Sequence, residues 1–267
     1  MLTVQQLKGD LHVHTSKEVC ETHLGMMIEE YDEACGCVPL AEVVAAARDV
    51  VGMEFIGITN HTSNPVDPEA DRVRADAYLA RQHAAVTELR AQRNDIAIFS
   101  GAEVNILPTG RLDVSEDVLG LLDYAIVSMH LLADREVQDI QLHYIQAMQH
   151  QRIKILGHAN RYIGMLTEGD WDAVVRAAVH FDVALEFNIA AQLTDELLGL
   201  MVQHNALITI GSDAHRWDPF TDYCRSLLGP KADPAPFVDT FSRLVDVPLA
   251  QIVNTWDAER IRDWFEA

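Results

Sequence analysis

The chain has 267 residues, with 41 acidic against 20 basic side chains and a formal net charge of -21. A hydrophobic fraction of 49% and a charged fraction of 23% exclude a disordered or fibrous chain. The charge argues against stable binding to nucleic acid or to an anionic membrane, because both depend on Lys and Arg contacts to phosphate. The count of 12 histidines is unusual, since imidazole is the commonest transition-metal ligand and a frequent general acid or base.

Cysteine content and the first residues both bear on location. Four cysteines in a chain of this length do not indicate a secreted disulfide framework. The N-terminal residues lack a charged start followed by an apolar signal core, and no apolar run approaches the length of a membrane span. We therefore expect a protein of the reducing cytoplasm.

Seven short aliphatic or β-branched runs alternate with segments of helical spacing. The runs cover 9–13, 54–59, 96–104, 124–129, 153–157, 183–187 and 207–211. Good helix formers at helical spacing lie between them, in 40–51, 70–92, 136–151, 170–181 and 194–205. This alternation predicts an α/β fold with parallel strands and outer helices as crossovers.

The chain shows no clear boundary between two domains. Residues 229–236, with the sequence GPKADPAP, are the best candidate for a break. The residues that follow are too few for an independent domain, and they predict closing helices over 237–245 and 258–265. We expect one barrel-like domain over 1–267, with its closing helices at about 237–266.

Each predicted strand ends in a side chain that can bind a metal or support a ligand. The loops after the strands of a parallel barrel converge at one rim, where active sites lie. In His12-Val13-His14, alternation along a strand points both rings to the same face, and Asp213-Ala214-His215 repeats the spacing. Seven such strand ends together predict a metal site. In chain order they carry His12 and His14; Asn60 and His61; Glu103; His130; His158; Glu186 and Asn188; Asp213 and His215.

The donor types narrow the choice of metal. Imidazoles with a few carboxylates and no thiolate cluster suit Zn, Mn or Fe rather than an all-oxygen Ca or Mg cage. The strand-end histidines together with Glu103 and Asp213 exceed the ligands of one ion, so we expect two or three divalent ions. Glu103 is well placed to bridge two of them, leaving a shared hydroxide as the nucleophile.

These strand ends carry motifs that resemble those of the polymerase and histidinol phosphatase (PHP) superfamily. The motifs occur in the family's order, as DLHVHT (10–15), ITNH (58–61), GAEVNI (101–106), SMH (128–130), GHANR (157–161), EFN (186–188) and GSDAH (211–215). The resemblance implies a distorted (β/α)7 TIM-like barrel that holds a trinuclear metal centre and hydrolyses phosphate esters.

The resemblance also implies which residues hold each ion. The third ion would take one ligand from the loop after the first strand, where His23 is the first choice and Cys20 or Glu18 the alternatives. The chain has Asn60 where the family usually has Asp, and the lost carboxylate is expected to weaken the orientation of a ligand. The implied sets are His12, His14, Glu103 and Asp213 for the first ion; Glu103, His130 and His158 for the second; His61 and His215 for the third.

A mechanism follows from this constellation. The bridging hydroxide attacks phosphorus in line, while metal ions and nearby cations bind the other phosphate oxygens. Arg161 is the best candidate for a phosphate clamp, because a guanidinium binds two oxygens at once. Lys17 and Arg216 are weaker candidates, because each is equally well interpreted as a solvated cation on the surface. Asp213 is expected to shuttle a proton in addition to binding metal.

Other polar features have simpler interpretations. The pair Cys35 and Cys37 lacks a second thiol pair, so we interpret it as part of a loop. An acidic run over 29–33 falls in the long predicted loop 15–38, where it would disfavour polyanionic substrates. Five histidines lie on predicted helices away from the rim and are interpreted as surface or packing residues: His83, His143, His150, His180 and His204.

The leading prediction is a metal-dependent phosphoesterase that acts on a small phosphate monoester, with histidinol phosphate as one candidate. One alternative is a nuclease or nucleotide phosphohydrolase, since related domains occur in DNA polymerases. Another is a non-catalytic metal-binding module that accompanies a polymerase. Hydrolysis of an amide or an ester is a further possibility, because the same hydroxide could attack carbonyl carbon.

Overall fold

A computed structural model describes residues 2–15, 38–62, 68–130, 137–159, 166–188, 194–214 and 238–267. All pairings between its strands are parallel. They form two sheets, in the orders β1-β2-β3 and β4-β5-β6-β7-β8. The strands are β1 (Gly9–Val13), β2 (Phe55–Ile58), β3 (Ala97–Ser100), β4 (Glu103–Asn105), β5 (Ala125–Ser128), β6 (Ile153–Leu156), β7 (Ala184–Asn188) and β8 (Ile208–Gly211).

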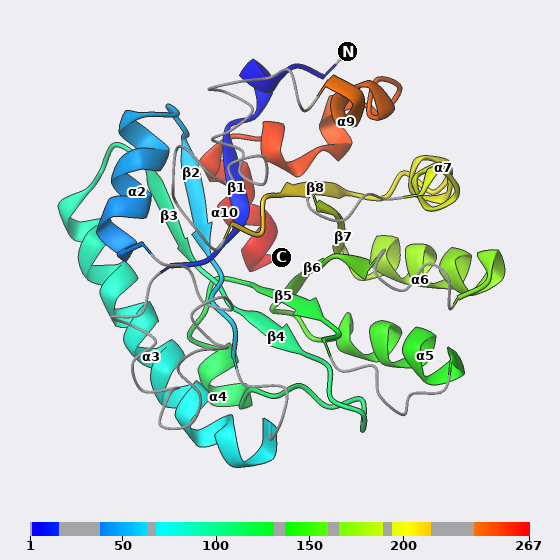
Figure 1. The fold of residues 1–267 in the computed structure, drawn as a ribbon, viewed down its shortest axis with the longest axis horizontal. Coiled ribbons are helices and arrows are strands. Elements are labelled where there is room, and N and C mark those ends of the chain that lie inside the picture. The colour runs from blue at the N-terminus through cyan, green and yellow to red at the C-terminus, as the bar shows by residue number, and fades with distance from the viewer. Residues whose placement is uncertain are drawn as a thin grey trace.

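Backbone contacts at two seams join these sheets into one ring. At the first seam, the Ile126 N–H donates to the Ala102 carbonyl at 2.9 Å, so β5 continues alongside the chain that leaves β3. At the second, Val13 and Ala214 form a parallel bridge, and the His14 N–H donates to the Ala214 carbonyl at 3.0 Å. The strands therefore surround a common centre (Figure 1), which confirms the predicted distorted parallel α/β barrel.

The strands match the seven predicted runs with one difference. The run 96–104 is not a single strand, because it divides into β3 and β4 at Gly101 and Ala102. A Cβ atom at Gly101 would lie 2.9 Å from both the Thr59 methyl group and the Tyr124 ring, so the chain needs glycine to pass there. Beyond the break, Glu103 forms a parallel bridge with His61. The break thus moves Glu103 next to the chain that follows β2.

Helices cover the outside of the ring (Figure 1). Several begin at a polar side chain that accepts a backbone N–H, as sequence rules predict. Thr167 and Asp170 form a capping box at the start of α6, and Thr194 accepts the Leu197 N–H at the start of α7. The helices are α2 (Leu40–Asp49), α3 (Pro68–Gln92), α4 (Glu116–Leu119), α5 (Val137–Ala147), α6 (Glu168–His180), α7 (Asp195–Gln203), α9 (Val238–Arg243) and α10 (Ala258–Glu266), with 3-10 turns at η1 (Val4–Gln6), η5 (Leu249–Gln251) and η6 (Val253–Thr255).

Helix α10 fills the amino-terminal end of the barrel. Phe265 stacks on Tyr124 with ring centroids 4.4 Å apart and meets Phe99 edge-on at 5.1 Å. The Tyr124 hydroxyl donates to the Leu11 carbonyl at 2.6 Å. These residues and Trp264 belong to one buried apolar cluster inside the ring. Because apolar side chains fill this end, the polar interior lies toward the carboxyl ends of the strands.

Several sequence predictions remain untested by the fold. The closing helices lie at α9 and α10, within the expected region, while a single domain over 1–267 stays a prediction. The acidic run 29–33, the cysteines of 35–37 and the candidate break 229–236 lie outside the described residues. In the described ranges, none of the helices combines the length and apolar character needed to cross a lipid bilayer.

Candidate metal centre

The carboxyl ends of the strands bring seven of the predicted metal ligands together. His12 lies in β1, and His14 follows it. Glu103 opens β4, and the other ligands follow β2, β5, β6 and β8. Most of them are buried, whereas the side chains of His61 and His130 keep 15% and 20% of their surface exposed. The seven are His12, His14, His61, Glu103, His130, His158 and Asp213.

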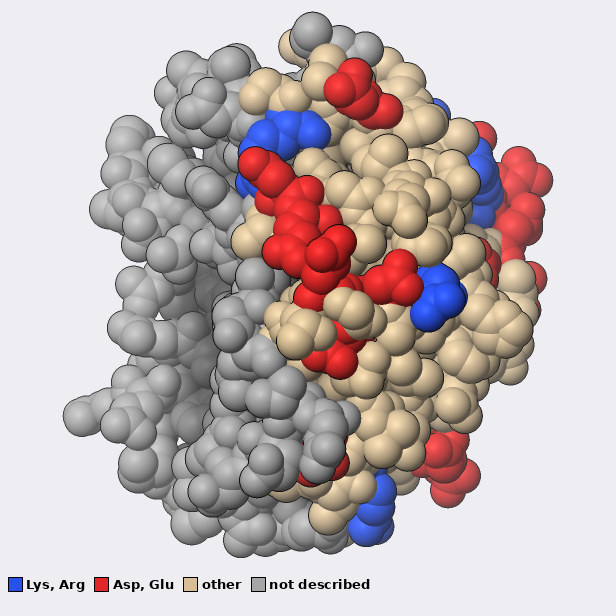
Figure 2. Space-filling model, turned by 90° about the vertical axis from the view of Figure 1, so that its right-hand side faces the viewer, with Lys and Arg blue, Asp and Glu red and all other residues tan. Residues whose placement is uncertain are grey.

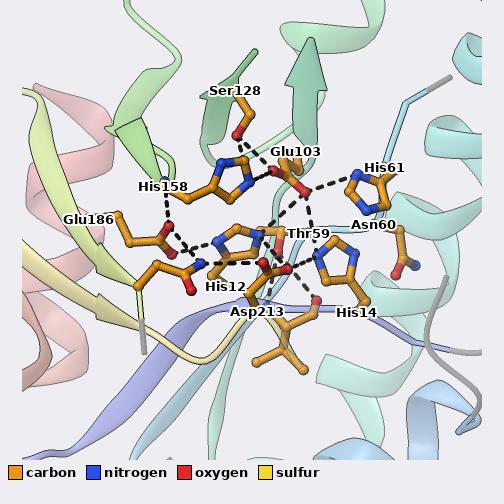
Figure 3. Close-up of polar contacts among 12 residues, drawn as sticks. His12, His14, Thr59, Asn60, His61, Glu103, Ser128, His158, Glu186 and Asp213 are labelled. Atoms are coloured by element: carbon orange, nitrogen blue, oxygen red, sulfur yellow. Dashed lines mark hydrogen bonds and ion pairs between the residues drawn. The ribbon is translucent and has the colours of Figure 1, made fainter. Parts of the chain in front are cut away.

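Glu103 lies at the centre of this cluster, and its two oxygens face different imidazoles. Figure 3 shows its carboxylate between His158 and His61. The Oε1 atom lies 2.7 Å from His158 Nε2 and 3.4 Å from His130 Nε2. The Oε2 atom lies 2.9 Å from His61 Nδ1, 3.4 Å from His12 Nε2 and 3.5 Å from His14 Nε2. One carboxylate therefore connects two groups of donors, as a bridging ligand does.

The first group consists of His12, His14, Glu103 and Asp213, whose donor atoms all lie within 4.8 Å of one another. Asp213 Oδ1 is 3.5 Å from His12 Nε2 and 3.2 Å from His14 Nε2. Two ligands held about 2.1 Å from a tetrahedral ion lie about 3.4 Å apart. The four measured separations between imidazole and carboxylate donors, 3.2 to 3.5 Å, match that value.

Two buried atoms in this group, His12 Nε2 and Glu103 Oε2, form no hydrogen bond of regular geometry with the described residues, although ionisable neighbours lie close to both. Burying a polar atom without a well-formed hydrogen bond costs about 1 to 3 kcal/mol, so a further contact would stabilise both atoms. A divalent cation accepts electron pairs from both an imidazole nitrogen and a carboxylate oxygen. The donor set therefore fits a divalent metal ion.

The predicted ligands of the second ion are Glu103, His130 and His158, and both histidines place Nε2 near Glu103 Oε1. The donor atoms that lie within 4.8 Å of one another on this side are those of His61, Glu103 and His130. Ser128 supports Glu103 by donating its hydroxyl to Oε1 at 2.7 Å. His158 has a φ of 24° and Asp213 a φ of 53°, which places both in the left-handed region. Such backbone conformations are uncommon for residues other than glycine and are often found at functional sites. Here they turn two donors inward immediately after β6 and β8.

Glu186 orients the first group from behind. Its Oε1 lies 2.5 Å from His12 Nδ1, and its Oε2 accepts the His158 backbone N–H at 2.7 Å. Asn188 donates its amide to Glu186 Oε2 at 3.2 Å and to Asp213 Oδ2 at 3.3 Å. Because the carboxylate accepts a hydrogen bond from the protonated Nδ1, His12 keeps the lone pair on Nε2 available as a metal donor.

Two supporting residues were not predicted from the sequence. His130 Nδ1 lies 2.5 Å from Asn105 Oδ1, and the Asn105 amide donates to Asp113 at 2.7 Å. Asn105 carries a usable signal, because it stands two residues after Glu103 and points to the same side of the strand. Asp113 gives no such signal, since it lies in a loop without periodic pattern.

Charge and burial shift several pKa values in the centre. Burial acts to lower the pKa of His12, but the carboxylates of Glu186, Asp213 and Glu103 raise it well above its usual value. Burial acts to raise the pKa of Glu103, yet the imidazoles of His61, His130 and His12 hold it well below its usual value. The same Glu103 carboxylate raises the pKa of His61 against the effect of burial. The centre therefore favours bound cations.

Asn60 contacts the chain that leaves β1, while the effect of the missing carboxylate on ligand orientation stays a prediction. Its Oδ1 accepts the Thr15 backbone N–H at 2.6 Å, and its Nδ2 donates to the Thr15 hydroxyl at 2.9 Å. The amide thus holds the backbone immediately after His14. This contact orients the end of β1 without a carboxylate at position 60.

Other candidate residues lie outside the described ranges. His61 groups with Glu103 and His130, so its assignment to a third ion remains a prediction. Of the five histidines predicted on helices, His150 lies beyond the end of α5 and 2.7 Å from Glu116, and His204 follows the last residue of α7 and lies 2.7 Å from Asp172. Both are away from the metal centre. The candidates that fall outside the described residues are Lys17, Glu18, Cys20, His23, Arg161, His215 and Arg216.

Comparisons with known proteins identify the relatives of this chain. It is 33% identical over 187 residues to a probable phosphatase of Caldicellulosiruptor bescii, a match that covers 66% of this chain and 72% of that protein. It is 27% identical over 228 residues to the DNA polymerase/3'-5' exonuclease PolX of Bacillus subtilis, covering 83% of this chain but only 36% of the relative. No family model matches the chain.

A solved structure shares the fold. The histidinol phosphate phosphatase of Lactococcus lactis, in complex with zinc, L-histidinol and phosphate, superposes with a TM-score of 0.52 at 17% sequence identity. The superposition covers 85% of this chain and 92% of that one. The fold, the cluster of histidines and carboxylates, and the similarity to the C. bescii phosphatase and to PolX agree with one another. The chain belongs to the PHP superfamily of phosphoesterases.

Proposed function

We propose that this chain is a metal-dependent phosphoesterase that hydrolyses a small phosphate monoester. The observation that carries this proposal is the position of Glu103, whose two oxygens face separate donor groups. Two or three divalent ions, Zn, Mn or Fe, would occupy the centre. The first would be held by His12, His14, Glu103 and Asp213; the second by Glu103, His130 and His158; the third by His61, His215 and His23.

The chain's own residues would divide the work of the reaction. When bound, the ions activate water for attack on phosphorus and offset the negative charge of the phosphate oxygens. Asp213 would take the proton from the attacking water, because its carboxylate borders the donor group while Asn188 holds its second oxygen at 3.3 Å. Arg161 would bind two phosphate oxygens, with Lys17 and Arg216 as further candidates.

Charge at the rim favours a small substrate over a polymer. The face formed by α5, α6 and α7 carries a run of acidic side chains (Figure 2). The first turn of α6 contains Glu168 and Asp170, and that of α7 contains Asp195 and Glu196. In a chain of net charge -21, these acids repel a nucleic-acid backbone that approaches the carboxyl ends of the strands. We expect no stable nucleic-acid partner and keep the cytoplasm as the expected location.

The identity of the monoester is a narrower proposal. Histidinol phosphate is the first candidate to test, because the Lactococcus lactis protein of the same fold was solved with L-histidinol and phosphate. A second function, removal of nucleotides from DNA, is supported by the match to the exonuclease PolX. That match spans about a third of the relative's length, so it supports the second function less than the phosphatase match supports the first.

Metal analysis combined with a substrate panel tests the proposal. The purified chain is loaded with Zn, Mn or Fe and assayed for phosphate release from histidinol phosphate, other monoesters, a phosphodiester and single-stranded DNA. We expect two or three ions per chain and selective release from monoesters. Glu103→Gln should abolish turnover, whereas Glu116→Gln, on the exposed start of α4, serves as the control. Full metal content without turnover on any substrate would contradict the proposal and favour an accessory module.

A further inference from the structure

A buried carboxylate, that of Asp113, lies behind His130 and is separated from its imidazole by the side chain of Asn105. Asp113 is fully buried although it belongs to the loop after β4. The loop turns back at Gly110, whose φ is 79°, and Ile106 pairs with Leu112 in an antiparallel bridge. The Asp113 N–H then donates to the Asn105 carbonyl at 3.2 Å. The turn therefore places the Asp113 side chain against Asn105.

The hydrogen bonds of Asp113 determine which way the Asn105 amide points. Asp113 Oδ1 accepts the Asn105 backbone N–H at 2.9 Å, and Oδ2 accepts the Asn105 amide at 2.7 Å. The Thr62 hydroxyl also donates to Oδ2, at 2.5 Å. A carboxylate only accepts hydrogen bonds, so the NH2 group of Asn105 must face Asp113. The amide oxygen must then point in the opposite direction, toward His130.

The amide oxygen in turn determines the tautomer of His130. Asn105 Oδ1 lies 2.5 Å from His130 Nδ1. Because an amide oxygen only accepts, Nδ1 must carry the proton, and the neutral ring keeps the lone pair on Nε2. That Nε2 atom lies 3.4 Å from Glu103 Oε1. A reversed amide would present NH2 to Nδ1 and move the proton to Nε2, where it would block metal binding.

We propose that Asp113, acting through Asn105, fixes His130 in the tautomer that presents Nε2 to the second metal ion. Asp113 and Asn105 are thus positioning residues. The proposal rests on the proposed function for the identity of the metal site. His12 obtains the same tautomer from direct contact with Glu186, whereas His130 obtains it from a neutral amide held by a carboxylate.

Nitrogen NMR of the histidine rings tests this directly. In metal-free wild-type protein, at a pH where the ring is neutral, the ring nitrogen shifts should show His130 protonated at Nδ1. In Asp113→Asn, the Asn105 amide can reverse, so we expect a mixture of both tautomers. The affinity for the second ion should fall about 10- to 100-fold, while the first ion binds normally.

A double variant separates positioning from general damage. In Asn105→Asp/Asp113→Asn the carboxylate moves next to His130, and position 113 can donate to it, so the Nδ1 proton and the second ion should both return. Asp123→Asn is the matched control, because Asp123 also accepts a strand N–H, from Ser100 at 2.7 Å, but lies away from the histidines. It should leave the tautomer unchanged.

The outcomes distinguish this proposal from the proposed function. A wild-type His130 protonated at Nε2, or an unchanged tautomer in Asp113→Asn, overturns the positioning role whether or not the protein hydrolyses phosphate esters. A fixed Nδ1 tautomer and two bound ions without turnover would leave the positioning role intact and overturn the proposed function. If Asp113→Asn does not fold, the wild-type spectrum and the double variant still test the positioning role of Asp113.

Discussion

Glu186 lies behind the His12 ring, with its Oε1 atom 2.5 Å from His12 Nδ1, while His12 Nε2 faces Glu103 at 3.4 Å on the opposite side. Glu186→Gln replaces a strong acceptor with a neutral amide that can also present NH2 to the ring. We expect affinity for the first ion to fall about 10- to 100-fold, measured by competition with a chelator. The surface variant Glu54→Gln removes a carboxylate that pairs only with Lys8 in the described part, at 3.3 Å, and should bind metal normally. Equal affinities in both variants would contradict the role of Glu186.

Gly211 at the end of β8 leaves the space that Glu186 occupies. A Cβ atom at position 211 would overlap Glu186 Oε1. Gly211→Ala should therefore displace the carboxylate from His12, weaken the first metal site and destabilise the fold by about 1 to 3 kcal/mol. Calorimetry and metal titration measure both effects.

Gly199 provides the matched control for that substitution. It lies within α7, and a Cβ atom there would meet nothing within 4 Å. Gly199→Ala should stabilise the protein by about 0.5 to 1 kcal/mol, because alanine favours the helix, and should leave metal binding unchanged. A Gly211→Ala protein that binds metal like Gly199→Ala would show that Glu186 has room to move.

Asp10 predicts a specific dependence of stability on pH in the metal-free protein. Burial raises its pKa from 3.8 to about 7 in the folded chain. Between these values the folded chain holds a proton that the unfolded chain has released, so the contribution of Asp10 to stability falls as pH rises. The slope approaches about 1.4 kcal/mol per pH unit.

Denaturant unfolding from pH 4 to 7, in the presence of a chelator, measures this contribution. Asp10→Asn cannot release a proton, so the unfolding free energy of the wild type minus that of the variant should decrease steadily across the range. The histidines of the centre also make the unfolding free energy depend on pH, but they do so in both proteins, so their effect largely cancels in the difference. A difference that is constant or increases with pH would contradict the raised pKa of Asp10.

Chelation should destabilise the folded chain. An ion that binds only the folded state at 100 times its dissociation constant adds about 2.7 kcal/mol to the free energy of unfolding. We expect the melting temperature of the wild type to rise on addition of metal and to fall again with a chelator. Glu103→Gln replaces one of the two oxygens with NH2 and removes the negative charge that both groups share, so it should show little response. An equal response in the two proteins would indicate that the ion binds elsewhere.

Much of the fold and the centre could be predicted from the sequence because local pattern and residue chemistry coincide there. The run 207–211 is apolar except for Thr209 because β8 is buried throughout, and His12 and His14 share a face because side chains alternate along β1. Glu103 was predicted as the bridging residue from its residue type alone.

The remainder depends on contacts between distant parts of the chain. The break between β3 and β4 follows from the packing of Gly101 against Tyr124, which no local period reveals. The four-residue helix α4, capped by Ser115, is too short to produce a helical pattern and was not predicted. Asp113 contacts Asn105 only because the chain turns back at Gly110, so the role of Asp113 could not be predicted from the sequence either.

The seam between β1 and β8 joins parts of the chain that are far apart in sequence. Ser212 donates its hydroxyl to the His12 carbonyl at 3.2 Å across a separation of 200 residues. His12 and His14 lie on one side of this seam and Asp213 on the other. An ion bound by all three would act as a removable cross-link, and closing so long a loop is entropically costly and slow. Completion of the barrel and capture of the first ion would then be a single late event in folding, and loss of that ion would release the two ends of the ring together.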